Sequence, residues 1–191
     1  GIALAKKVCE KLGKGAILYR FKNFGTAMID FNGENYEFVG ARTESYSTDS
    51  RKPIIEEGSL QDDLNRRDFT INAMAIELNQ ENFGTLIDAS NGQADLKNKI
   101  IKTPLNPTET YSDDPLRMMR AVRFANQLNF KIEEKSFQEI KKNAERLQIV
   151  SKERITEELN KILLCKKPSF GLNFLFESNL LQQFFQALGN L

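Results

Sequence analysis

Apolar residues recur at helical spacing at the start of the chain, and short strand-like runs follow them. Within residues 2–12 the apolar positions are Ile2, Leu4, Ala5, Val8, Cys9 and Leu12. Gly13 and Gly15 end this pattern. The runs ILYR, TAMIDF and YEFVGAR come next, with Asn32-Gly33 at a tight-turn position between the last two. The sequence therefore predicts a helix over 2–12 and then antiparallel strands.

The pattern changes three times before residue 92. Residues 43–58 are polar, with Ser, Asp, Pro and Gly, and predict an exposed loop. LQDDLNRRDFTINAMA, residues 60–75, has helical periodicity. AIELNQENFGTLIDA predicts a second hairpin around residues 79–84.

From about residue 92 the pattern is helical, apart from the short run IIKT. Helices are predicted near residues 113–129, 134–144, 151–164 and 168–188. A mixed part followed by an all-helical part predicts an α+β fold with a boundary near residue 105, where TPLNPTE carries two prolines. The last helix is apolar on more than one side, so it requires a partner surface from the same chain or from a second subunit in a homodimer.

The composition excludes several kinds of catalytic chemistry, but it does not by itself indicate a binding partner. The net charge is only +1, so binding to a polyanion would depend on local patches. The chain has no histidine, which excludes histidine-based acid–base catalysis and histidine metal ligands. Two distant cysteines fit a reducing compartment, and no apolar run approaches the ~20 residues that span a bilayer. These features predict a cytoplasmic protein that does not enter a membrane.

The segment SDDPLRMMRAVRF, residues 112–124, is the first candidate site. Ser112 suits a helix N-cap, and acidic residues favour the positive end of a helix dipole. Asp114 and Arg117 are three residues apart and so share a face, and Arg120 and Arg123 continue the row at the same spacing. The segment is either a capped helix with exposed ion pairs or a binding row of one carboxylate and three guanidiniums.

The Asp114 and Arg117 pair would match particular bases. A carboxylate only accepts hydrogen bonds and a guanidinium only donates them. Cytosine and adenine present an amino donor beside a ring-nitrogen acceptor, whereas guanine and uracil present a carbonyl beside an N–H. Each buried mismatch would cost about 1–3 kcal/mol, so the pair would select C and A. Arg120 and Arg123 would then meet phosphate oxygens.

The segment LNRRDFTINAMA, residues 64–75, is the second candidate site. Arg66, Arg67 and Asp68 could bind phosphates and a ribose hydroxyl. An RRD tripeptide on a helix is more often a solvated face, and only the apolar run FTINAMAI around it favours binding.

Taken together, these segments resemble a known family. RRDFTINAMA resembles the RRD motif of the class II tRNA nucleotidyltransferases and their poly(A) polymerase relatives. DDPLRMMRAVRF resembles that family's EDxxR motif, with Asp113 in place of the usual Glu. SKERITEELNKIL resembles the ERxxxEL motif, and FGTAMIDF and EFVGARTESY resemble the sheet segments that precede RRD. The motifs follow the family's order from about residue 2 to residue 180.

The resemblance implies an organisation and an activity. Residues 1–104 would be a nucleotidyltransferase head that lacks its N-terminal part, 105–165 a helical neck that selects nucleotide and binds RNA, and 166–191 the start of a helical body. The activity would be addition of CMP and AMP from CTP and ATP to the tRNA 3′ end. A poly(A) polymerase, an enzyme that adds part of CCA, and a non-catalytic nucleotide- or RNA-binding module remain alternatives.

The resemblance also implies roles for individual residues. Asp114 and Arg117 would select the base, Arg67 and Asp68 would contact ribose and phosphates, and Arg154 with its neighbour Glu153 would brace the neck helices. For tRNA, the candidate contacts lie among the basic residues after position 131, which are otherwise solvated helix faces. They are Lys141, Lys142, Arg146 and Lys152.

The family's metal site is expected outside this chain. The resemblance implies a glycine-rich segment and a DxD pair that hold Mg²⁺, which would lie just before Gly1. Glu37 is the additional metal-side carboxylate that we consider in the chain. Without the DxD pair, we expect these 191 residues on their own to catalyse little or nothing.

Overall fold

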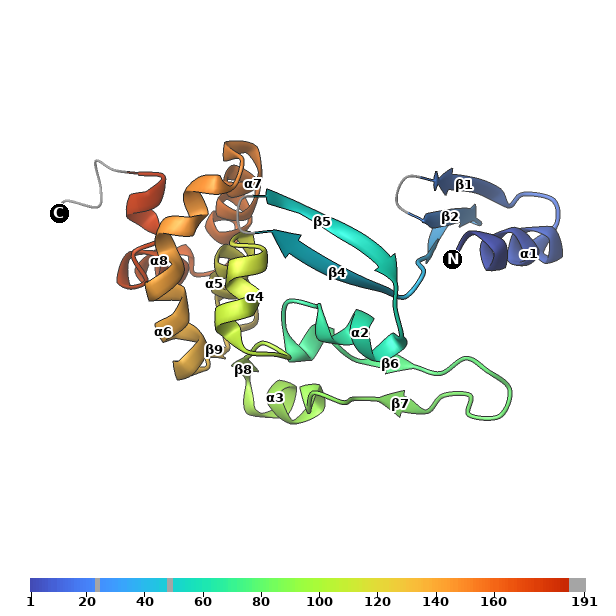
Figure 1. Cartoon of the computed structure of the whole chain (residues 1–191), viewed down its shortest axis with the longest axis horizontal. Helices are drawn as coiled ribbons and strands as arrows, with labels where there is room; N and C mark the ends of the chain where they lie inside the picture. The colour runs from blue at the N-terminus through green and yellow to red at the C-terminus, as the bar shows by residue number, and fades with distance from the viewer. Residues whose placement is uncertain (23–24, 48–49, 186–191) are drawn as a thin grey trace. The chain divides into compact units, whose positions relative to one another are not determined.

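The computed structural model describes residues 1–22, 25–47 and 50–185. The chain divides into two compact units, Gly1–Thr43 with Ile55–Asp62 and Glu44–Ile54 with Asp63–Leu191 (Figure 1). The boundary predicted near residue 105 follows composition, the one at residue 166 follows the family resemblance, and both stay predictions. Among the described residues, no helix is both long enough and apolar enough to cross a bilayer.

The first unit confirms the predicted helix and antiparallel strands. It contains α1 (Ile2–Leu12), β1 (Ile17–Phe21), β2 (Thr26–Phe31) and β3 (Glu34–Phe38) in a sheet of order β1-β2-β3. Asn32 and Gly33 both have positive φ, 56° and 81°, as a two-residue hairpin turn requires. Ala5 of α1 and Ala27 and Ile29 of β2 form its buried core.

The prediction of a loop over residues 43–58 was wrong. β4 (Arg42–Ser47) and β5 (Ser50–Glu57) pair in a two-stranded sheet. Ser, Asp and Pro in this stretch favour a loop, but main-chain hydrogen bonds hold a two-stranded ladder whatever the polarity of its side chains.

The continuous helix predicted over residues 60–75 is also not found. α2 (Leu60–Asn65) ends before Arg66, and a 3-10 turn at Thr70–Asn72 follows. The Asp68 carboxylate accepts a hydrogen bond from the Phe69 N–H at 2.9 Å, a local contact that competes with helical bonding. The RRD segment therefore lies in a turn. The next hairpin, β6 (Ala75–Ile76) with β7 (Leu86–Ile87), is antiparallel as predicted.

The rest of the second unit is mainly helical. Its elements are α3 (Gly92–Asn98), β8 (Ile100–Ile101), α4 (Pro107–Asp113), α5 (Leu116–Leu128), β9 (Lys131–Ile132), α6 (Glu134–Asn143), a 3-10 helix (Ala144–Ile149), α7 (Lys152–Leu163), α8 (Pro168–Glu177) and a 3-10 turn (Leu181–Gln183). The helices predicted at 134–144 and 151–164 are confirmed, and β8 pairs with β9 in parallel. The last helix, predicted over 168–188, ends at Glu177, because Asn179 takes a left-handed conformation with φ 61°. Residues 186–188 of that prediction lie outside the described residues.

The helix predicted near residues 113–129 is α5, which begins at Leu116, and α4 precedes it as a helix that was not predicted. α4 has the Asn106 side chain as its N-cap, accepting from the Thr108 N–H at 3.2 Å. Ser112 lies inside α4 and is not the cap that we predicted. Asp114 has extended φ and ψ of −133° and 96°, because a residue before proline disfavours the helical region. Asp114 therefore stands at the junction of α4 and α5.

Helix α5 lies at the centre of the core of the second unit. Met118, Met119 and Val122 are fully buried on it, and it packs against α7 and α8. The helices approach closely at Gly171 of α8. A Cβ there would lie 2.5 Å from Ile162 Cγ2 and 2.7 Å from Asn126 Nδ2.

Replacing Gly171 by alanine should therefore destabilise the protein. Overpacking costs about 1–3 kcal/mol, against about 1 kcal/mol gained in helix propensity. The central expectation is a net loss of about 1 kcal/mol, and at most about 2 kcal/mol, in the free energy of unfolding, measured in urea. Asn173→Ala, at an exposed position of the same helix, is the control and should change stability by less than about 0.5 kcal/mol. Equal stability of the two variants would contradict the close approach.

Candidate functional site

A cleft of about 570 Å³ opens in the second unit where the RRD turn faces the start of α5. Five arginines and two aspartates contribute to its wall, so its charge is positive. It is lined by Arg66, Arg67, Asp68, Asn72, Asp114, Leu116, Arg117, Arg120, Phe124 and Arg154.

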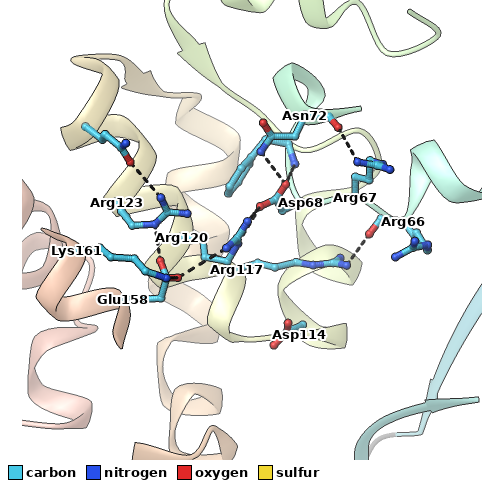
Figure 2. A network of polar contacts seen from close by, with 12 residues as sticks. Arg66, Arg67, Asp68, Asn72, Asp114, Arg117, Arg120, Arg123, Glu158 and Lys161 are labelled. Carbon is cyan, nitrogen blue, oxygen red and sulfur yellow. Dashed lines mark hydrogen bonds and ion pairs between the residues drawn. The ribbon is translucent and has the colours of Figure 1, made fainter. Parts of the chain in front are cut away.

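Asp68 connects the RRD turn to α5. Its Oδ1 accepts from the Phe69 N–H at 2.9 Å and from the Asn72 amide at 3.0 Å. Its Oδ2 accepts from Arg120 Nε and Nη2 at 2.9 and 2.7 Å (Figure 2). Only 9% of Asp68 is exposed. A carboxylate held by four hydrogen bonds has one orientation, and it fixes the turn against the helix.

Asp63 holds the two arginines of the turn. Arg66 Nε donates to Asp63 Oδ1 at 3.0 Å and Arg67 Nη2 to Asp63 Oδ2 at 3.2 Å. Burial would raise the pKa of Asp63, but the hydrogen bonds and charges of Arg66 and Arg67 outweigh it and lower that pKa. The Arg67 side chain stays 44% exposed, so its guanidinium can reach an anion in the cleft.

Asp114 and Arg117 both line the cleft but turn to different partners. Arg117 Nη2 donates to the Arg66 carbonyl at 2.5 Å. Asp114 Oδ2 lies 3.4 Å from Arg154 Nη2 of α7. Figure 2 shows the Arg117 side chain extended toward Arg66, with Asp114 below it.

Arg120 and Arg123, which we predicted to meet phosphates, have different environments. Arg120 lines the cleft and pairs with Asp68. Arg123 lies outside the lining, is 9% exposed, and donates to Glu158 Oε2 at 2.6 Å with its guanidinium 4.0 Å from the Phe124 ring centroid. On a helix, residues three apart are offset by about 60° around the helix axis. Arg123 lies two such steps after Arg117, so the two side chains point about 120° apart. The row is therefore split between the cleft and the α5–α7 contact.

Comparison with known proteins identifies the family to which this arrangement belongs. The model of the poly A polymerase head domain matches residues 3–102, and that of the probable RNA- and SrmB-binding site of polymerase A matches residues 129–190. The chain belongs to the tRNA nucleotidyltransferase and poly(A) polymerase family.

Curated relatives of the family are longer than this chain. The CCA-adding enzyme of Pediococcus pentosaceus is 45% identical over 158 residues, which are 82% of this chain and 39% of the relative. The A-adding tRNA nucleotidyltransferase of Aquifex aeolicus is 40% identical over 174 residues, 91% of this chain and 20% of the relative. The chain thus spans about two fifths of the length of the first of these relatives.

Solved structures of the family share the fold of this chain. A CCA-adding enzyme in an apo form matches with a TM-score of 0.87 and 34% identity, over 97% of this chain and 44% of that one. A tRNA nucleotidyltransferase complexed with a primer tRNA and an incoming ATP analog matches with a TM-score of 0.81 and 34% identity, over 97% and 51% of the two chains.

The cleft carboxylates do not fit a metal ion. Asp68 and Asp114 each face an arginine, so guanidinium groups already occupy positions that a cation would need. Glu37, on β3, is exposed. In the described ranges, no group of three or more His, Cys, Asp or Glu side chains could hold a metal. Nucleotidyltransferases of this family are generally metal-dependent. The described residues of this cleft, however, form no site that could bind a metal ion.

The four residues predicted to meet RNA lie in the part that matches the RNA-binding model. Lys141 lies over the Phe137 ring at 4.8 Å, and Lys142 pairs with Glu139 at 2.7 Å, both near the end of α6. Arg146 donates to the Ser112 carbonyl at 2.9 Å. Lys152, at the start of α7, is exposed.

Sequence reasoning missed three cleft residues and did not place a fourth, Arg154, in the cleft. Asn72, Leu116 and Phe124 line the cleft without a polar motif of their own. Arg154 was expected only to brace the neck, although it lies in the cleft wall against Asp114. Its place in the segment that resembles ERxxxEL was the one available signal.

Proposed function

We propose that this cleft selects the incoming nucleotide in a full-length protein that adds CMP and AMP, from CTP and ATP, to the 3′ end of tRNA. The observation that carries the proposal is the presence of Asp114 and Arg117 in one cleft with the RRD turn. Asp114 would accept the amino group of cytosine or adenine, and Arg117 would donate to the ring nitrogen.

The remaining charges suit the rest of the nucleotide. Among the cleft arginines that form an ion pair, Arg67 has the most exposed side chain. It is therefore the one we assign to the phosphates, because a planar guanidinium binds phosphate oxygens well. Asp68 would accept from a ribose hydroxyl in exchange for one of its present donors, because its four hydrogen bonds already use the roughly four lone-pair positions of a carboxylate. Mg²⁺ is proposed for the full-length protein, held by residues outside those described here.

The decisive experiment supplies the nucleotides separately. Full-length protein is incubated with tRNA lacking its 3′ CCA, with CTP, ATP or both, and the products are resolved by length. Addition of two residues from CTP and of a third only when ATP is also present supports CCA addition. If the protein adds no nucleotide while active full-length relatives, assayed in parallel, do, the proposal is overturned. A non-catalytic nucleotide- or RNA-binding module would then be the remaining interpretation.

Addition of the terminal A only is a second candidate. The relative named an A-adding tRNA nucleotidyltransferase matches 91% of this chain. In that case tRNA ending in CC would accept AMP, while tRNA lacking all of CCA would accept nothing from CTP. A poly(A) polymerase would instead extend an RNA with ATP repeatedly.

We further propose that Lys141, Lys142, Arg146 and Lys152 contact the tRNA backbone. Replacing Lys141 and Lys142 together by alanine should weaken tRNA binding and make the slope of log K against log salt shallower by about one to two. The matched control is Lys6→Ala with Lys7→Ala, an adjacent exposed pair on α1. If both pairs leave the slope unchanged, the α6 lysines are ordinary solvated residues.

The homodimer and the cytoplasmic location stay predictions. For the homodimer, the supporting observation is that α8 leaves Phe170 and Phe176 38% and 55% exposed.

A further inference from the structure

Asp114 and Arg117 are natural partners for each other, yet in the structure each turns elsewhere. Asp114 stands just before α5, three residues ahead of Arg117, and an acid and a base this close in sequence can reach each other as an ion pair. A closed pair would satisfy the carboxylate and the guanidinium together. The two groups would then point at each other, and neither would face a base in the direction that selection requires.

Contacts with three neighbouring residues keep the two groups apart. On one side, the Arg66 carbonyl accepts from Arg117 at 2.5 Å and draws the guanidinium toward the RRD turn. On the other, Arg154 Nη2 lies 3.4 Å from Asp114 Oδ2. The Leu116 N–H donates to Asp114 Oδ1 at 3.3 Å, so each carboxylate oxygen has a fixed neighbour.

The position of Arg154 follows from the packing of α7. Arg154 and Glu158 are four residues apart and therefore share a face of this helix, which packs on α5. Glu158 is 3% exposed and is fixed by Arg123 at 2.6 Å, which holds that face against α5. Arg154 is thereby placed beside the α4–α5 junction, where the extended backbone of Asp114 presents its carboxylate.

We infer that Arg154 is a positioning residue for base selection: it holds the Asp114 carboxylate away from Arg117 so that both remain open to the base. The inference rests on the proposed function, because it assigns a role within the same cleft. Arg154 need not leave when a nucleotide binds, since the carboxylate has further lone pairs for the amino group. The side chains of Arg154 and Asp114 are 41% and 23% exposed, so the contact can adjust to a ligand.

The test compares variants of the full-length protein at Arg154. With Arg154→Ala, Asp114 can close on Arg117, so KM for CTP and ATP should rise about tenfold and the preference for CTP over UTP should fall about tenfold. Because the reacting atoms are untouched, kcat at saturating CTP should change less than about threefold. Arg154→Lys keeps a charged donor and should recover most of the preference.

Controls separate this role from simple helix bracing. Glu157→Gln changes an exposed charge on the same helix and should leave KM and preference unchanged. If Arg154→Ala does not fold, as judged by circular dichroism, Arg154→Gln keeps a polar side chain with an N–H donor but loses the charge and part of the length, and it should still lose part of the preference. Equal losses of kcat/KM for CTP, ATP, UTP and GTP, with preference intact, would overturn the inference.

The same assay distinguishes failure of the inference from failure of the proposed function. If the unmodified full-length protein adds neither C nor A, the proposed function fails. If it adds them, and Asp114→Ala relaxes selection while Arg154→Ala does not, only the role of Arg154 is refuted.

Discussion

Full-length protein carrying Asp114→Ala should accept UTP and GTP that the unmodified protein rejects. The variant removes the acceptor for the amino group of cytosine or adenine, and with it the group that opposes the carbonyl of uracil or guanine. One buried mismatch with the wrong base costs about 1–3 kcal/mol, and the variant no longer imposes that cost on UTP. The ratio of kcat/KM for CTP over UTP should therefore fall about tenfold to a hundredfold. Competition assays with tRNA and labelled nucleotides measure this ratio.

Arg117→Ala should relax selection through the other half of the pair. It removes the donor that meets a ring nitrogen and opposes an N–H, and it also frees the Arg66 carbonyl at the RRD turn. Glu109→Ala, at an exposed acid on α4, is the control for loss of a carboxylate and should keep the original preference. Unchanged preference in both cleft variants would mean that Asp114 and Arg117 do not read the base.

Asp68→Asn should damage both stability and activity. The amide would present a donor to Arg120 or lose the contact with Asn72, so part of the four-bond arrangement would be left unsatisfied. For a carboxylate that is 9% exposed, paired with a partly exposed arginine, we expect a loss of about 2–3 kcal/mol. In a protein of roughly 150–250 residues, that corresponds to a Tm lower by roughly 4–12 °C.

The accompanying loss of activity should exceed what unfolding explains. The RRD turn and α5 meet through Asp68, so a shift of the turn misplaces Arg67 relative to Asp114. A misplacement of about 1 Å can cost on the order of 100-fold in rate, and we expect a fall of that size in kcat/KM for CTP at a temperature where the variant is folded. Glu145→Gln, an exposed acid, should retain both Tm and activity. An active Asp68→Asn protein with an unchanged Tm would refute this role.

Local patterns were sufficient for elements that carry their own turn or cap signals. Asn32-Gly33 predicted the β2–β3 hairpin because both residues tolerate positive φ, and the helix at 151–164 was found from its apolar spacing. The patterns failed where side chains bond to nearby backbone. Asp68 interrupts the helix expected over 60–75, and the proline after Asp114 separates α4 from α5.

The chemistry of the candidate site could be predicted from the identity of its side chains, because a carboxylate accepts and a guanidinium donates hydrogen bonds wherever they lie. That is why Asp114, Arg117, Arg67 and Asp68 could be proposed before any fold was known, and all four line one cleft. Which arginines face that cleft depended on packing. Regular spacing put Arg123 in the same row as Arg117, but helical rotation turns it toward α7, where Glu158 binds it. The same helix brings Arg154, 40 residues away in sequence, against Asp114. No spacing along the chain encodes such a contact, since it arises only when α5 and α7 pack together.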